Sequence, residues 1–291
     1  MATLTAPQPQ PPASADWPTI WAYIMPAIDH IMCSPSNEGD GSPPKIDAEY
    51  HMGIYSAIFN YSTTSRAPKS SIPDTGRRDA FGIADPPQKD LDQYYANAAR
   101  VLLSEAPEAP SELIPYVVAS FDRYSTRAAI VSRMFSYYNR HWVRRASCEG
   151  RGWMIIPKKD RPEKIEAVKR SQLKQWGFPK VDAATAEARA EAGTSPDRIV
   201  RPESIALRRF RSGFIEPMLG DVAEGEGQNP NIQGKLKTAV EEILQEGSTA
   251  DEQDRAKKVL EILTNVGMRR KDTLIQMLEV HVVGQERGTI N

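Results

Sequence analysis

The amino-acid sequence predicts an all-α protein. Apolar residues recur at three- and four-residue spacing in one segment after another, which is the pattern of amphipathic helices. No segment shows the sustained alternation of apolar and polar residues, bounded by hairpin turns, that is typical of β-strands. Five helical segments fall within residues 16–151, and this density of helices indicates a five-helix bundle.

The first helix is predicted to begin at Trp17 and to continue to about Met32. Asp16 is placed to cap it, and Pro18 is tolerated because it lies in the first turn. Residues 1–15 are rich in proline and alanine and cannot bury enough apolar surface to offset the entropy of ordering the chain. We therefore expect them to form a disordered tail.

Four more helices complete the predicted bundle. The second extends from Ile46 to Thr63, and the stretch Thr64 to Pro87 that follows is rich in serine, proline, glycine and arginine, which predicts a long mobile loop. Helical spacing then predicts three further helices: Leu91–Ser104, a helix capped by Ser111 that ends at Tyr124, and Ala128–Arg145.

The composition changes after the predicted bundle. Residues 157–203 hold many lysines and arginines and then an alanine- and glutamate-rich stretch, which indicates an insertion that is partly helical and mostly exposed. An apolar stripe returns in Ser204 to Leu219, Gly220 to Gly234 is predicted to be a flexible linker, and helical spacing resumes at Leu236. Residues 204–291 are thus predicted to form a second, truncated helical domain.

Charge and cysteine content narrow the class of protein. The formal net charge is −1, from 37 Lys plus Arg against 38 Asp plus Glu, so no global attraction draws this chain to nucleic acid or to a membrane surface. The longest apolar runs stop short of the ~20 residues that cross a bilayer, so we expect no membrane partner. With only Cys33 and Cys148 and no secretory leader at Met1, we expect the cytoplasm or the nucleus.

The residues that usually carry chemistry form no recognisable group. The four histidines show no pairing with cysteine or acidic residues of the kind that a metal ion needs, so no metal site is predicted. The sequence also lacks a glycine-rich phosphate loop and the common hydrolase motifs. We therefore expect a protein that is not an enzyme and needs no cofactor.

Two predicted helices have more apolar surface than one core can bury. In the second helix, one side contains Ile54, Ile58 and Tyr61, and an adjacent side contains Met52, Tyr55 and Phe59. One set can face the bundle and the other a partner, because methionine and tyrosine suit recognition surfaces. The alternative is that both sets are core in a larger assembly.

The helix predicted from Ala128 to Arg145 has a similar pattern. One stripe contains Val131, Phe135, Tyr138 and Trp142, and Met134, Tyr137 and His141 lie beside it. Its last turn is basic, which favours the negative carbonyl end of a helix. Its arginines therefore either stabilise that helix end or form a basic rim beside an apolar surface.

A second function class stays open for the basic residues from Arg140 to Lys174. Tryptophans are interleaved among them, and such a cluster can contact phosphates and stack on bases. This alternative is a helical nucleic-acid-binding protein that uses the basic insertion. The even balance of charge over the chain favours a solvated surface instead.

Several segments resemble cullins of the SCF type. The run from Tyr137 to Arg145, YYNRHWVRR, resembles the family segment Y-L-N-R-H-W-V-R-R at all but one position. Met52 to Tyr55, with Phe59 to Tyr61, is similar to the family helix Y-M-x-L-Y-x-x-x-Y-N-Y. Ser204 to Leu219 is similar to the segment that opens the second cullin repeat.

The resemblance implies a stalk of cullin repeats, each a five-helix bundle, that acts as a non-catalytic scaffold of a cullin-RING ubiquitin ligase in ubiquitin-dependent protein catabolism. Residues 16–151 then correspond to the first repeat, which binds a Skp-family adaptor carrying an F-box receptor. In the family, the second and fifth helices of this repeat form the adaptor surface. Carried over by position, the adaptor-binding candidates are His51, Met52, Tyr55, Phe59, Met134, Tyr137, Tyr138 and His141.

The sequence also departs from the family. His51 stands where the family usually has tyrosine, which predicts a weaker or differently hydrogen-bonded contact. The family's carboxyl-terminal domain, which holds the RING-box protein, has no counterpart in the 291 residues, so we expect no RING-box partner. A fragment, a misassembled gene model and a truncated paralogue that sequesters adaptor all stay open.

Overall fold

The computed structural model describes residues 3–35, 43–63, 86–154, 162–177, 182–220, 234–246, 250–269 and 272–288. Apart from one isolated bridge between Leu4 and Ile46, the regular structure of these residues is helical, which confirms the all-α prediction. No described helix is both long and apolar enough to cross a membrane. The loop predicted after the second helix and the linker predicted before Leu236 lie almost entirely outside the described residues.

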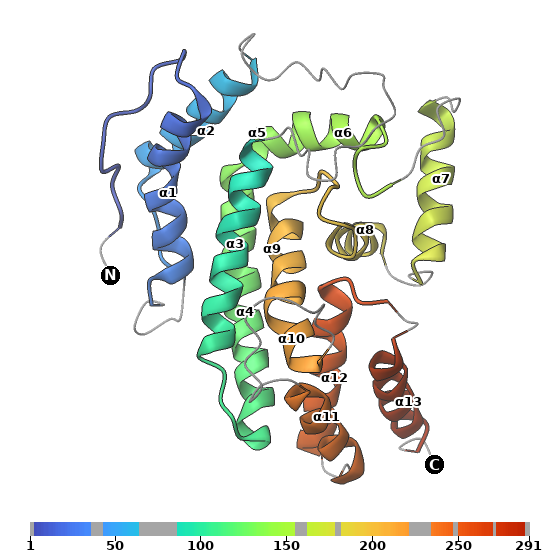
Figure 1. Ribbon diagram of the computed structural model, residues 1–291. Helices are drawn as coiled ribbons and strands as arrows, with labels where there is room; N and C mark the ends of the chain where they lie inside the picture. Colours follow the sequence, from blue (N-terminus) through green and yellow to red (C-terminus); the bar gives the residue numbers. More distant parts are fainter. Residues whose placement is uncertain are drawn as a thin grey trace. The chain divides into compact units, whose positions relative to one another are not determined.

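Helices follow one another through the described residues (Figure 1). They are α1 Trp17–Cys33, α2 Ala48–Thr63, α3 Pro86–Ser104, α4 Pro110–Met134, α5 Ser136–Tyr138, the π-helix η1 Asn139–Val143, α6 Arg144–Cys148, α7 Pro162–Gln175, α8 Ala183–Ala192, α9 Pro202–Phe210, the π-helix η2 Arg211–Ile215, α10 Glu216–Leu219, α11 Lys235–Glu246, α12 Ala250–Asn265 and α13 Thr273–Gly288.

The chain divides into two compact units, each made of three separated segments. Unit 1 comprises Met1–Asp92, Tyr124–Ile155 and Ser195–Glu203. Unit 2 comprises Gln93–Arg123, Ile156–Thr194 and Ser204–Asn291. The sequence analysis predicts continuous domains, whereas each compact unit combines separated segments. The assignment of residues 16–151 and 204–291 to cullin repeats stays a prediction.

In unit 1, α1 and α2 lie side by side (Figure 1). The carboxylate of Asp16 caps α1 as predicted, accepting a hydrogen bond from the Thr19 amide at 3.1 Å. Tyr50 of α2 donates its hydroxyl hydrogen to the carbonyl oxygen of Tyr23 at 2.6 Å, and the two rings meet edge to face at 5.2 Å. Gly53 lets the helices approach, because a Cβ there would overlap the Tyr23 hydroxyl.

Leu4 pairs with the backbone ahead of α2, and the disordered tail expected for residues 1–15 stays a prediction. The Leu4 amide donates to the carbonyl oxygen of Lys45 at 3.1 Å, and the Asp47 amide donates to that of Leu4 at 2.8 Å. Pro11 is buried. These hydrogen bonds satisfy backbone groups of Leu4, and the composition of the segment alone does not predict them.

The predicted helix boundary between Tyr124 and Ala128 is wrong. Residues 125–127 contain neither glycine nor proline, and α4 runs through them without interruption. Arg127 is only 3% exposed and donates from Nη1 to the carbonyl oxygen of Met32 at 2.7 Å, so it helps to end α1. The break comes instead at Phe135, whose φ of −90° and ψ of 22° separate α4 from α5.

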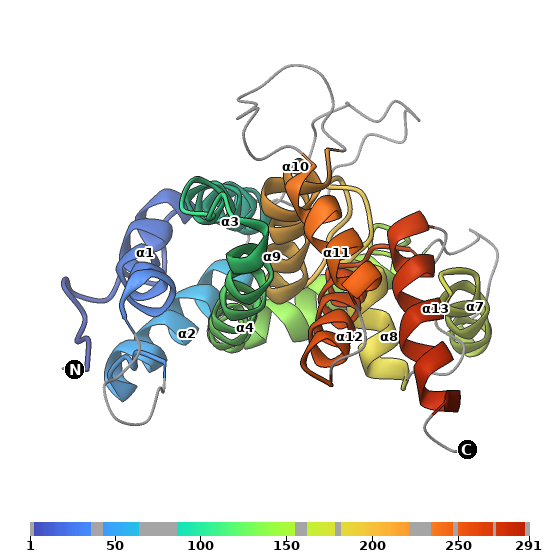
Figure 2. The same cartoon turned by 90° about the horizontal axis from the view of Figure 1, so that it is seen from below.

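In unit 2, α12 lies against α8, α11 and α13 (Figure 2). The alanine-rich stretch that we expected to be mostly exposed forms α8, where Ala186, Ala190 and Ala192 are buried. Small side chains permit this close packing: a Cβ on Gly267, just after α12, would overlap the backbone of Gly193, just after α8. The expectation of exposure was therefore wrong for this part of residues 157–203.

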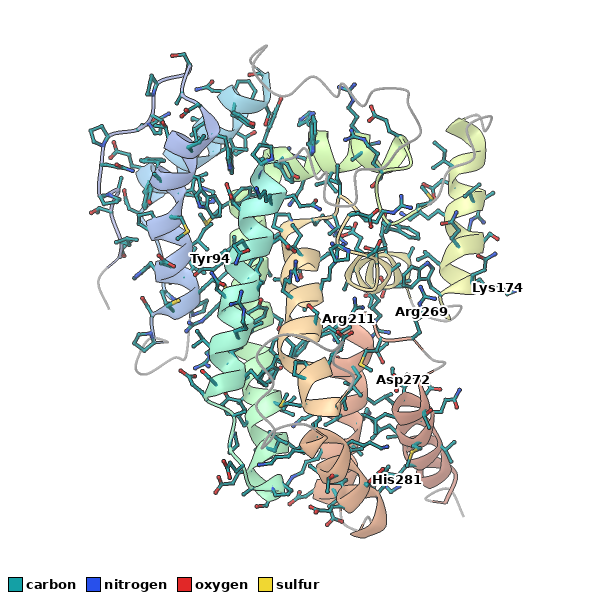
Figure 3. The ribbon with its side chains drawn as sticks, viewed as in Figure 1. Tyr94, Lys174, Arg211, Arg269, Asp272 and His281 are labelled. Carbon is teal, nitrogen blue, oxygen red and sulfur yellow. The ribbon has the colours of Figure 1, made fainter. Side chains whose placement is uncertain are left out.

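The carboxyl-terminal end of α12 is held by two arginines (Figure 3). Arg211 donates from Nη1 to the carbonyl oxygens of Val266 and Gly267, each at 3.3 Å. Arg269 lies over the ring of Trp176 at 4.5 Å. The apolar stripe predicted in Ser204 to Leu219 is confirmed, because its members are all buried: Ile205, Leu207, Phe210, Phe214 and Met218.

Candidate docking surface

One side of α2 is buried in unit 1 and another side is exposed. Ile54 and Ile58 are 0% and 2% exposed, whereas Met52 and Phe59 are 58% and 41% exposed. Tyr55 lies between them along the helix and is half-buried. The two sides predicted from helical spacing are therefore separated as expected, and the second one is available to a partner.

Tyr137 of α5 extends this exposed side across two helices. Its ring meets that of Phe59 edge to face at 4.9 Å and that of Tyr55 at 6.2 Å. On its other side it stacks with the imidazole of His141, with ring centres 4.3 Å apart. We call the resulting surface the aromatic patch, and it consists of Met52, Tyr55, Phe59, Tyr137 and His141.

Buried residues fix the backbone that carries Tyr137 and His141. Phe135, Tyr138 and Val143 are at most 4% exposed and anchor α5 and η1 in the core of unit 1. The Asn139 side-chain nitrogen donates to the carbonyl oxygen of Ser132 at 3.0 Å, which ties η1 back to the last turn of α4. The patch thus stands on an anchored backbone.

Three of the residues expected to contact an adaptor lie outside the patch. Met134 and Tyr138 are 1% and 3% exposed, so their side chains serve the core. His51 is half-buried beside Met52, at the edge of the patch. The expectation that Met134 shares a face with Tyr137 and His141 fails, because the break at Phe135 separates Met134 from α5, whereas Tyr137 and His141 do stack on each other.

Arg140 borders the patch, although helical spacing alone did not single it out. It is exposed, donates from Nη2 to the Tyr55 hydroxyl at 3.3 Å and from Nε to the carbonyl oxygen of Ser136 at 3.3 Å. The run of arginines after Tyr137 was the sequence signal. Only the neighbouring position of α2 shows that one of them lies beside the apolar surface.

Arg145 and Arg151 are paired within unit 1. Glu149 accepts from Arg145 at 2.7 Å and from Arg151 at 2.5 Å, and Arg151 also lies over the Trp142 ring at 5.4 Å. Burial acts to raise the pKa of Glu149, but the hydrogen bonds and charges of the two arginines outweigh it and lower that pKa. In unit 2, Lys169 is likewise paired with Glu187 at 2.5 Å.

The fold and the patch together define an all-α protein with an exposed aromatic surface of the kind that docks other proteins. By sequence, the chain is similar to Cell division control protein 53 of Saccharomyces cerevisiae, with 23% identity over 154 residues. The alignment covers 48% of this chain and 17% of the yeast protein, so the chain spans less than a fifth of the length of this relative. The distant similarity supports a cullin-like relationship. No family model matches the chain, and no solved structure matches it.

Proposed function

We propose that this chain is a non-catalytic scaffold that binds a Skp-family adaptor, and through it an F-box receptor, in ubiquitin-dependent protein catabolism. The resemblance of Tyr137 to Arg145 to the cullin segment and the distant similarity to the yeast protein support this proposal. The proposed contact surface is the aromatic patch, with His51 at its edge.

The observation that carries the proposal is the exposure of Met52 and Phe59 on α2 beside Tyr137 of α5. Large apolar side chains that are exposed together are typical of interaction sites. Burying one such side chain fully contributes about 1.5–3 kcal/mol. Tyr137 is already held between Phe59 and His141, so its ring loses little further freedom on binding.

Binding to a Skp-family adaptor is measured by isothermal titration calorimetry. We expect Tyr55→Ala together with Tyr137→Ala to weaken binding by roughly 2–4 kcal/mol for each anchor, to the point where it is barely measurable. Met52→Ala should weaken it less, since one flexible side chain is lost. Met277→Ala is the matched control, because Met277 is 39% exposed on α13 in unit 2.

Three results bear on the proposal. Circular dichroism should show that every variant retains its helical signal, since the substituted side chains are partly or mostly exposed. Loss of affinity in the patch variants and unchanged affinity for Met277→Ala would support the patch as the binding surface. Unchanged affinity for the double variant would refute that assignment, and no binding by the wild-type chain would refute the function.

A further inference from the structure

Positive charge gathers in the segment that carries Tyr137 and His141. Residues 136–151, which form α5, η1, α6 and the turn after them, contain four arginines and one glutamate. Helix α2 on the other side of the patch contains one acidic residue, Glu49, and neither lysine nor arginine. This segment is therefore basic although the whole chain is almost neutral, and its Arg140 reaches the patch at the Tyr55 hydroxyl.

Internal ion pairs account for only half of these arginines. Arg145 and Arg151 share the carboxylate of Glu149 at 2.7 and 2.5 Å. Arg140 and Arg144 are exposed and form no ion pair with a carboxylate in the described part of the chain. These two lie four residues apart, about one helical turn, so they stand near each other along η1 and α6.

Arg140 is held beside the apolar surface. Its Nη2 reaches the Tyr55 hydroxyl and its Nε reaches the carbonyl oxygen of Ser136, both at the long distance of 3.3 Å. Neither acceptor carries a net charge, so the positive charge of the guanidinium is not neutralised there. A guanidinium has five donors in a fixed fork, and its remaining donors can pair with a carboxylate of a partner.

We infer that the partner of the aromatic patch is a protein surface with acidic side chains next to its apolar contacts, and that Arg140 and Arg144 pair with those carboxylates. This inference rests on the proposed function. Complementary charges at the edge of an apolar contact speed association and fix orientation more than they add affinity. The patch would thus supply most of the affinity, and the two arginines would select an acidic partner.

The test uses the full chain and a Skp-family adaptor, with association rates from surface plasmon resonance at 50 and 500 mM NaCl. Salt at 500 mM screens exposed charges at short range, so wild-type association should slow roughly tenfold or more. Arg140→Glu with Arg144→Glu should slow it about tenfold at 50 mM and little at 500 mM. The control is Arg100→Glu, which reverses an exposed positive charge on α3 in unit 2 and should leave the association rate almost unchanged.

The outcomes separate this inference from the proposed function. If the Tyr55→Ala, Tyr137→Ala variant loses binding while salt and charge reversal change nothing, the inference is wrong and the proposed function stands. If the adaptor does not bind at all, both fall. Tighter binding of a 20-nucleotide single-stranded DNA than of the adaptor, with the same dependence on Arg140 and Arg144, would also overturn it in favour of a nucleic-acid partner. The wild-type salt titration needs no variant to fold.

Discussion

Replacing Gly53 by alanine tests how α2 is positioned. Gly53 lies on the side of α2 that faces α1, and an alanine Cβ would overlap the Tyr23 hydroxyl and lie 3.3 Å from its Cζ. The Tyr23 ring has little room to move, because Tyr23 is 2% exposed and meets the Tyr50 ring at 5.2 Å. The contact thus controls which side of α2 carries Met52 and Phe59 outward.

Two opposing terms set the size of the effect. Alanine is favoured over glycine in a helix interior by about 0.8–1 kcal/mol, whereas inserting atoms into a packed contact costs about 1–3 kcal/mol. We expect overpacking to win and Gly53→Ala to lower the free energy of unfolding by roughly 1–2 kcal/mol. In a Tyr23→Phe background the overlapping oxygen is absent, so the same change should be neutral or stabilising by up to about 1 kcal/mol.

Urea titrations of the wild type, both single variants and the double variant measure this coupling. We expect a coupling free energy of roughly 1–3 kcal/mol between positions 23 and 53. If Gly53→Ala stabilises the wild-type chain, or if Tyr23→Phe gives no recovery, the packing argument for α1 and α2 is refuted. In that case the contact does not position α2, and Gly53→Ala should also leave the affinity of the aromatic patch for the adaptor unchanged.

Two more predictions concern the cores of the units. Gly267→Ala should lower the free energy of unfolding by roughly 3 kcal/mol or more, because φ is +83° and the Cβ would overlap the Gly193 backbone. Gly234→Ala, with φ of +78° and no atom within 4 Å, should cost only about 1–2 kcal/mol; equal melting temperatures for the two variants would contradict this. Burial, and to a smaller extent the charge interaction with Tyr23, raise the pKa of Tyr50 to about 12. The neutral Tyr50 hydroxyl therefore stabilises the folded state below pH 10, and this contribution should be lost as the pH rises from about 10 toward 12. A tyrosinate absorbance titration should lose its last step in Tyr50→Phe, and an unchanged titration would show that another tyrosine is responsible.

Local signals predicted the helices well where they are strong. Asp16 and Pro18 mark the start of α1, and the spacing of Ile54 and Ile58 separates the buried side of α2 from Met52 and Phe59. These features depend on residues within one or two turns of each other, so the sequence is sufficient.

Helical spacing did not predict the exposed side of the segment around Phe135. Extending one helical phase from Ala128 to Arg145 placed Met134 on the partner side, whereas it is 1% exposed. The break at Phe135 and the π-turn of η1 have no local marker such as glycine or proline, and Phe135, Tyr138 and Val143 in this region are all buried. Likewise, the alanines of α8 are buried because α12 approaches them closely, which no pattern within the stretch reveals.

The sequence by itself determined that the chain is all-α, that α2 has two apolar sides, and that YYNRHWVRR resembles a cullin segment. The resemblance already grouped Tyr137 and His141 with the second helix, and helical spacing already placed Tyr138 on the stripe with Val131 and Phe135. The tertiary structure alone decided that Met134 is buried and that Arg140 donates to the Tyr55 hydroxyl. The physical reason is range: helical periodicity fixes neighbours within a turn, whereas a surface shared by residues some 80 positions apart depends on how two helices pack.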